Sequence, residues 1–85
     1  MKKEVKILKA LANEKRLKIL RLLSNESGLS VIEIANKINL HFKSTSKHLQ
    51  KLSEAGLIKS RRDGVWVRFD LVKKAEKLLE DIGNF

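Results

Sequence analysis

The chain has 85 residues, of which 19 are lysine or arginine and 10 are aspartate or glutamate, and its formal charge at pH 7 is +9. This length suits one small domain with a modest core, to which a partner subunit would add buried area. The absence of cysteine excludes disulfides, thiolate metal sites and thiol redox switches.

The positive charge favours a polyanionic partner, and it is unevenly distributed. Residues 1–24 carry eight cations against two anions, and residues 40–70 carry seven against three. Nucleic acid fits this balance better than a membrane, because the sequence has no long apolar span and no lipidation signal. Nothing resembles a signal peptide, so we expect a cytoplasmic protein.

Three helices are predicted in the first half of the chain. Residues 4–11 form a short helix with a broad apolar face. Asn13 can cap a second helix that runs to about Ser24, and its high density of leucine and isoleucine predicts the most buried helix. Ser30 and Glu33 have the spacing of a capping box, which predicts a third helix over residues 31–38.

The turn over residues 39–41 leads into a fourth helix, over residues 42–55, with His41 as a mediocre N-cap. At helical spacing, four residues of this helix form a stripe for a core: Phe42, Thr45, Leu49 and Leu52. The opposite face is polar and suits a groove of nucleic acid, because lysine is drawn to phosphates and glutamine can pair with adenine. Any solvated helix can show such a face, so the segment that follows it matters.

Gly56 is placed to end this helix, and residues 57–62 and 65–71 are two β-capable runs around Asp63-Gly64, a strong signal for a two-residue turn. With that turn, Lys59 lies opposite Arg68 and Arg61 lies opposite Trp66. One face of the hairpin is then apolar near its base and the other is cationic. Like charges directly opposite one another are unfavourable, which suggests an anion alongside. Trp66 either forms a cation–π pair with Arg61 or only shields the sheet.

A last helix is predicted over residues 72–82, ended by Gly83. The chain is therefore expected to be one domain over residues 1–85, mainly α with a two-stranded β-hairpin (an α+β fold), in the order ααααββα. A helix-turn-helix followed by a basic hairpin, the wing over residues 57–71, is a winged helix-turn-helix pattern.

Three strings carry a family resemblance: LKALANEKRLKILRLL, LSVIEIANKINL and STSKHLQKLSEAGLIKSRRDGVWVRFDL. Their most specific marks are Leu11-Ala12-Asn13, Ser46-Lys47-His48-Leu49 and Arg62-Asp63-Gly64. From residue 8 to residue 71 the chain resembles the ArsR/SmtB family of winged-helix repressors. The resemblance implies a homodimer joined through its first and last helices, which places two recognition helices in successive major grooves of an operator and represses transcription.

The terminal helices, over about residues 4–11 and 72–82, also have apolar faces that a chain of this size has little interior to bury. We therefore predict a dimer interface that uses Val5, Leu8, Leu11, Leu78, Leu79 and Ile82.

The sequence departs from the metal-sensing members of that family. Their thiolate motif is replaced by Gly28-Leu29-Ser30-Val31-Ile32, and residues 71–85 contain no histidine. The acids of the last helix lie among lysines and are interpreted as solvated helix charges. We therefore expect no transition metal and no cofactor. His48 is interpreted as a hydrogen-bonded, partly buried residue or a phosphate contact rather than a ligand.

The leading hypothesis is a dimeric, sequence-specific regulator that binds double-stranded operator DNA. Its predicted DNA contacts are Lys43, Ser44, Ser46, Lys47, Gln50, Lys51, Arg61, Arg62 and Arg68. A module that binds protein or structured RNA is the alternative, since basic residues suit either partner. An enzyme is not expected, because the sequence shows no nucleophile turn, no glycine-rich phosphate loop and no paired-carboxylate cleft.

Overall fold

A computed structural model describes residues 1–83 of the chain. The elements run in the order α1 (Lys2–Leu11), α2 (Glu14–Asn25), α3 (Val31–Ile38), α4 (Phe42–Glu54), β1 (Ile58–Asp63), β2 (Trp66–Leu71) and α5 (Lys73–Ile82). The predicted fold class and the order ααααββα are confirmed. Several predicted boundaries move by one or two residues; for example, α1 begins at Lys2 rather than residue 4 and α4 ends at Glu54 rather than residue 55.

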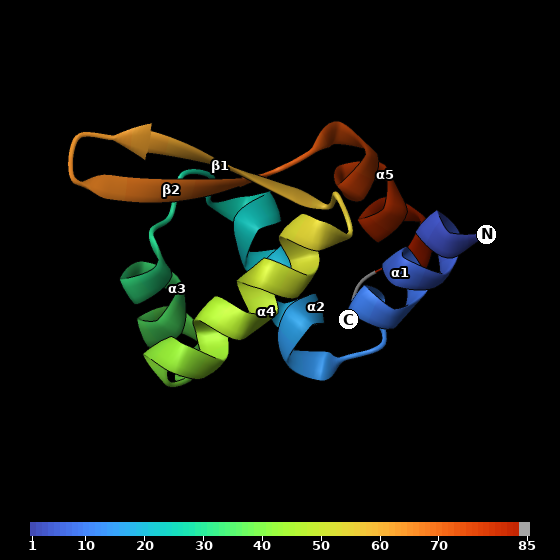
Figure 1. Ribbon diagram of the computed structural model, residues 1–85, viewed down its shortest axis with the longest axis horizontal. Helices are drawn as coiled ribbons and strands as arrows, with labels where there is room; N and C mark the ends of the chain where they lie inside the picture. The colour runs from blue at the N-terminus through green and yellow to red at the C-terminus, as the bar shows by residue number, and fades with distance from the viewer. Residues whose placement is uncertain (84–85) are drawn as a thin grey trace.

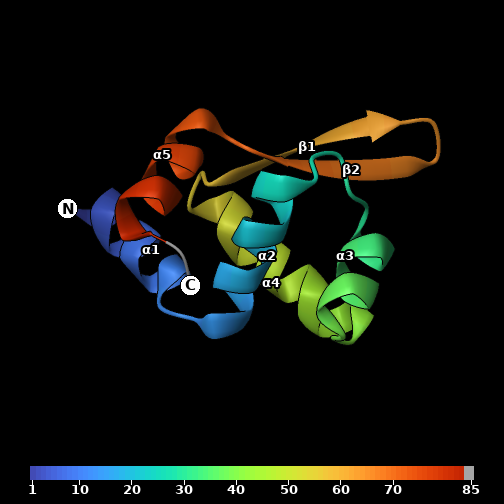
Figure 2. The ribbon, with the colours of Figure 1, turned by 180° about the vertical axis from the view of Figure 1, so that it is seen from behind.

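The molecule is elongated, with extents of 36 × 23 × 22 Å. In Figure 1, α2 lies at the centre, α1 and α5 lie side by side at one end, and the hairpin runs along one side of the helices to a tip at the other end. The view from behind in Figure 2 shows the same arrangement. The terminal helices and the wing tip are therefore at opposite ends of the long axis.

Local signals explain where the helices begin. The Asn13 side chain accepts a hydrogen bond from the Arg16 backbone N–H at 3.1 Å, which caps α2. At the start of α3, the Ser30 and Glu33 side chains each accept a hydrogen bond from the other residue's backbone N–H, which completes the predicted capping box. His41 makes no side-chain capping bond, yet α4 begins at Phe42 as predicted. The His41 carbonyl oxygen accepts two hydrogen bonds from Thr45, from its backbone N–H and its hydroxyl.

The core forms where α2, α3 and α4 meet the base of the hairpin. Its largest fully buried side chains are Ile19, Leu20, Ile34, Thr45, Leu49, Leu52 and Leu57. α2, predicted to be the most buried helix, is central and contacts every other helix and β2, but α4 buries as many residues. These contacts fix α4 from its inner side.

The hairpin register differs from the predicted one. Asp63 pairs with Trp66, so Gly64 and Val65 form the turn, and the predicted Asp63-Gly64 turn is wrong by one residue. Gly64 has φ of 63° and Val65 does not have a positive φ, which is the pattern of a type II′ turn with glycine in its first central position. The change keeps Asp63 within the strand, where its carboxylate reaches Arg68. Every strand residue consequently faces a partner two positions from the predicted one.

The second edge of β2 is partly covered by the loop before α3. The Gly28 N–H donates to the Phe69 carbonyl at 2.9 Å, and the Phe69 N–H donates to the Leu29 carbonyl at 2.8 Å. Leu29 thus pairs with Phe69 in an isolated antiparallel bridge. The wing is tied by backbone hydrogen bonds to the segment that leads into the helix-turn-helix.

Candidate nucleic-acid interface

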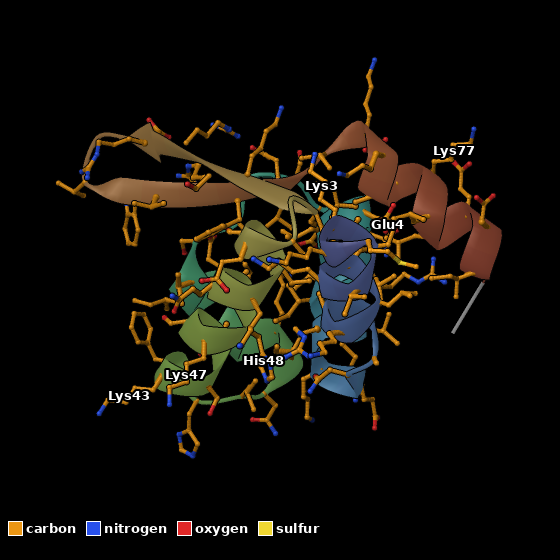
Figure 3. All side chains as sticks on the ribbon, turned by 45° about the vertical axis from the view of Figure 1, so that its right-hand side comes forward. Lys3, Glu4, Lys43, Lys47, His48 and Lys77 are labelled. Atoms are coloured by element: carbon orange, nitrogen blue, oxygen red, sulfur yellow. The ribbon has the colours of Figure 1, made fainter. Side chains whose placement is uncertain are left out.

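The two faces of α4 are chemically distinct, as predicted. Thr45, Leu49 and Leu52 are buried against the core. Lys43, Lys47, Gln50 and Lys51 are exposed, and Ser44 and Ser46 are half-buried. Figure 3 shows the labelled Lys43 and Lys47 side chains extending from α4 away from the rest of the protein.

Phe42 departs from the predicted stripe, because 54% of its surface is exposed. It occupies the first position of α4, beyond the reach of the core that covers Thr45 and Leu49. Helical periodicity predicts which direction a side chain takes, but not whether the core extends far enough to cover it.

Gln50 is exposed on the outer face of α4, beside the lysines. Its amide nitrogen lies 3.5 Å from a carboxylate oxygen of Glu54, one turn further along α4. This distance is at the limit of a hydrogen bond, so the amide is lightly held and can exchange this partner for another.

The wing arginines at positions 61 and 68 already have acidic partners within the chain. Arg61 lies opposite Arg68 rather than Trp66, and Lys59 lies opposite Asp70 rather than Arg68, so both predicted pairings are wrong. Nε of Arg61 is 2.9 Å from Asp70, and Nε of Arg68 is 2.9 Å from Asp63. The predicted anion beside the like charges is therefore a pair of aspartates of the hairpin itself.

Arg68 is held further by the loop before α3. Its guanidinium donates to the Gly28 carbonyl at 2.9 Å and lies 3.7 Å from a Glu33 carboxylate oxygen. Gly28 has φ of 75°, and a Cβ there would lie 2.8 Å from the Arg61 guanidinium. Glycine is favoured at this position because its positive φ strains other residues, whereas the flexible end of Arg61 could move aside.

Arg62 is different, because it lies on the other face of the hairpin, opposite Val67. Its side chain is exposed, and no hydrogen bond or ion pair within residues 1–83 holds its guanidinium. Trp66 is also 48% exposed beside the turn, and the register places Asp63 rather than Arg61 opposite it. Among residues 1–83, Arg62 is therefore the arginine of the wing without an acidic partner, and it lies near the tip.

His48 is partly buried on the side of α4 that faces α2, as predicted. Its Nδ1 lies 3.4 Å from the Arg16 guanidinium, which can only donate, so this contact requires Nδ1 to act as the acceptor. Burial lowers the pKa of His48, and the positive charges of Arg16 and Lys15 lower it further.

Within residues 1–83, no three His, Cys, Asp or Glu side chains gather in a group that could hold a metal ion.

The predicted dimer residues fall into three groups by exposure. Val5, Leu8 and Ile82 are exposed, with 65% of Leu8 accessible, and Leu11 and Leu78 are half-buried. Leu79 is only 5% exposed, so the expectation that it lies on a free surface is wrong. A shallow groove of about 520 Å³ runs between α1 and α5, with Ile7, Leu8 and Leu78 along it and charged residues at its margins.

The sequence profile of winged helix-turn-helix DNA-binding proteins matches residues 12–59, which is more than half of the chain. The chain belongs to the winged helix-turn-helix DNA-binding family. This membership agrees with the prediction of a DNA-binding protein rather than an enzyme. No curated protein matched the chain in a sequence comparison.

Several solved structures are similar to this chain over nearly its whole length. HlyU from Vibrio cholerae has 34% sequence identity and a TM-score of 0.84, with 94% of this chain and 87% of that one covered. The repressor PagR of Bacillus anthracis has 25% identity and a TM-score of 0.85, with 96% and 94% covered.

A homodimeric winged helix-turn-helix domain of a candidate ArsR-family regulator from Mycobacterium bovis has 29% identity and a TM-score of 0.89, with 95% of this chain and 75% of that one covered. The resemblance to ArsR-type regulators is confirmed by these structures.

None of the helices described over residues 1–83 is long and apolar enough to cross a membrane.

Proposed function

We propose that this protein is a homodimeric, cytoplasmic repressor that binds a specific operator in double-stranded DNA. The observation that carries the proposal is the outer face of α4, where Lys43, Lys47 and Gln50 are exposed while the inner face of the same helix is fixed in the core. A rigid helix with an uncovered polar face can enter a major groove without reorganising.

The predicted contacts take different roles in this proposal. Lys43, Lys47 and Lys51 are assigned to phosphates, and Gln50 is assigned to a base edge, with Ser44 and Ser46 allowing close approach of the helix. Arg62 at the wing tip is assigned to the sugar-phosphate backbone or the minor groove. Arg61 and Arg68 are assigned mainly to positioning the wing, because their guanidinium groups are bound to Asp70 and Asp63.

Selection of bound fragments from genomic DNA, followed by gel-shift titration, tests the proposal. We expect one preferred duplex to bind at least about a thousandfold more tightly than random duplex at the same salt concentration, as specific DNA-binding proteins do. A structured RNA of equal length serves as the competitor. Tighter binding to the RNA, or equal binding to every duplex, would contradict the proposal and favour an RNA-binding module.

The dimer is proposed to form over the groove between α1 and α5, and Leu8→Glu tests it. Leu8 is exposed, so the substitution should leave the fold intact while placing a charge in an apolar contact. We expect a monomer by sedimentation, with operator affinity reduced on the order of a hundredfold because two linked half-sites become independent. Ile32→Glu is the control for an added charge, because Ile32 is also an exposed apolar residue but lies on α3. A wild-type protein that sediments as a monomer at micromolar concentration would rule out this arrangement.

A further inference from the structure

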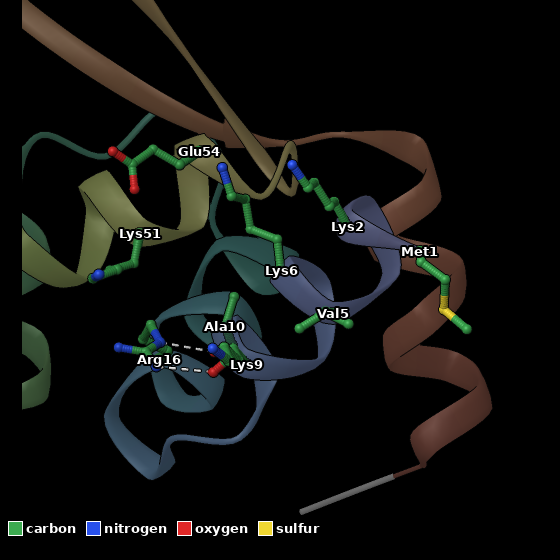
Figure 4. A pocket seen from close by; sticks show the side chains of 9 residues that line it. All are labelled: Met1, Lys2, Val5, Lys6, Lys9, Ala10, Arg16, Lys51 and Glu54. Carbon is green, nitrogen blue, oxygen red and sulfur yellow. Dashed lines mark hydrogen bonds between the residues drawn. The ribbon is translucent and has the colours of Figure 1, made fainter.

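A second concave surface lies between α1 and the C-terminal end of α4. This cleft has a volume of about 620 Å³, and its walls carry five cationic side chains from three helices: Lys2, Lys6, Lys9, Arg16 and Lys51. Figure 4 shows these side chains around the opening, with Glu54 as the acidic residue among the lining residues. Val5 and Ala10 add an apolar surface inside the cleft.

The positive charge of this cleft is largely uncompensated. Within residues 1–83, the ammonium groups of its four lysines form no hydrogen bond or ion pair. Arg16 donates to the carbonyl oxygens of Ala10 and Lys9, at 2.8 and 3.0 Å, which are neutral acceptors. A concave surface with a large excess of positive over negative charge, here five cations against Glu54, concentrates anions, so an anion is the expected occupant.

We propose that the cleft binds a small organic phosphate of about nucleotide size. The volume lies within the range of about 300–1,000 Å³ of small-molecule sites. The lysines suit the phosphoryl oxygens as mobile point charges, and Arg16 is held in place by α1. The accessible apolar surface of Val5, above the nearly buried Ala10, suits the uncharged body of such a molecule better than it suits a bare inorganic anion.

Occupancy of the cleft is connected to DNA binding through α4, and this step rests on the proposed function. Lys51 and Glu54 belong to the same helix as the reading residues, and Glu54 is the hydrogen-bond partner of Gln50. A bound phosphate adds negative charge beside a helix that must approach a polyanion, and it draws Lys51 away from the DNA backbone. The ligand therefore weakens DNA binding, and by linkage DNA weakens ligand binding by the same factor.

Calorimetric titration of the full chain tests the site directly, with ATP and inorganic triphosphate as probes. The double variant Lys6→Gln/Lys9→Gln removes two cations of the cleft. The matched control, Lys3→Gln/Lys73→Gln, makes the same change in net charge at residues that line none of the cavities described above. We expect the cleft variant to bind ATP roughly fivefold to twentyfold more weakly than wild type, since each screened charge contact contributes a factor of a few. The control variant should change less than about twofold, and wild type should prefer ATP to triphosphate.

Equal losses in the two variants, or no binding of ATP by wild type, would overturn the site, because general charge attraction would then explain the result. The salt dependence of DNA binding separates the site from the DNA footprint. A log–log slope for the cleft variant equal to that of the control supports a ligand site. A slope lowered only in the cleft variant would assign these lysines to the DNA backbone and overturn the proposal. The calorimetry needs no operator, so its outcome is independent of the proposed function.

Discussion

The outer face of α4 and the outer face of the wing are both basic in sequence, but they present their charge differently. The α4 lysines point into solvent and have no acidic partner among residues 1–83, whereas Arg61 and Arg68 of the wing are bound to Asp70 and Asp63. The difference follows from geometry, because alternate residues of a strand share a face and a hairpin brings two strands together. Basic residues in a predicted nucleic-acid site therefore have to be weighed against the acids that the fold brings beside them.

The largest expected effect is on the free energy of unfolding, and it should distinguish the buried face of α4 from its exposed face. Leu52→Ala removes a fully buried side chain, so we expect a loss of about 2–5 kcal/mol in the free energy of unfolding, measured by urea denaturation. Lys47→Ala on the exposed face should change stability by less than about 0.5 kcal/mol. Comparable losses in the two variants would mean that the outer face also supports the fold.

Gln50→Ala tests whether the free face of α4 reads sequence. If Gln50 makes a bidentate base contact, its loss should cost about 1–3 kcal/mol on the preferred site and little on random duplex, as measured by gel-shift titration. Folding stability should hardly change, because the residue is exposed. An equal loss on both DNAs would assign Gln50 to the backbone instead.

The two kinds of wing arginine can be compared directly. Arg62→Ala should lower the log–log salt slope of DNA binding by roughly one unit, if its side chain neutralises one phosphate. Arg68→Ala should leave that slope nearly unchanged and instead reduce stability by up to about 1 kcal/mol, because it removes a partly screened ion pair and a bond to Gly28. If Arg68→Ala lowered the salt slope as much as Arg62→Ala, the conclusion that Arg68 is occupied within the fold would be wrong.

His48 gives the smallest effect, a pH dependence of stability. Its pKa in the folded chain is below the ordinary value of 6.5, so the unfolded chain takes up a proton first as the pH falls. Stability should therefore be highest above pH 6.5 and should decrease as the pH falls from there towards the lower folded pKa. Urea denaturation of wild type and His48→Gln at several pH values checks this, since the variant should lose that part of the pH dependence. Identical profiles would show that His48 titrates alike in both states.

Much of the helical part of this fold could be predicted, because its signals are local. The capping box at Ser30 depends on residues three positions apart, and both members lie within one turn. The inner stripe of α4 was predicted for the same reason, apart from Phe42. Leu79 shows the limit of such signals. Helical periodicity placed it on the apolar face of the last helix, but could not decide whether its own subunit or a partner covers it.

The hairpin register and the cationic cleft could not be predicted, since both depend on contacts between distant segments. Asp63-Gly64 is a strong turn signal, but Gly64-Val65 also satisfies a turn and lets Asp63 reach Arg68. The cations of the cleft are separated by more than 40 residues in the chain, between Lys6 and Lys51, and only the packing of α1 beside α4 brings them together.

The hydrogen bonds between Phe69 and residues 28–29 also bear on self-association. A strand edge with unpaired backbone groups is a template for pairing with another chain, and β2 has part of its second edge covered by this loop. The edge of β1 has no such cover in the described structure, and this strand carries Lys59, Arg61 and Arg62 in its six residues. Two such edges would repel each other on approach, so the wing should resist edge-to-edge aggregation even though its tip exposes Val65 and Trp66.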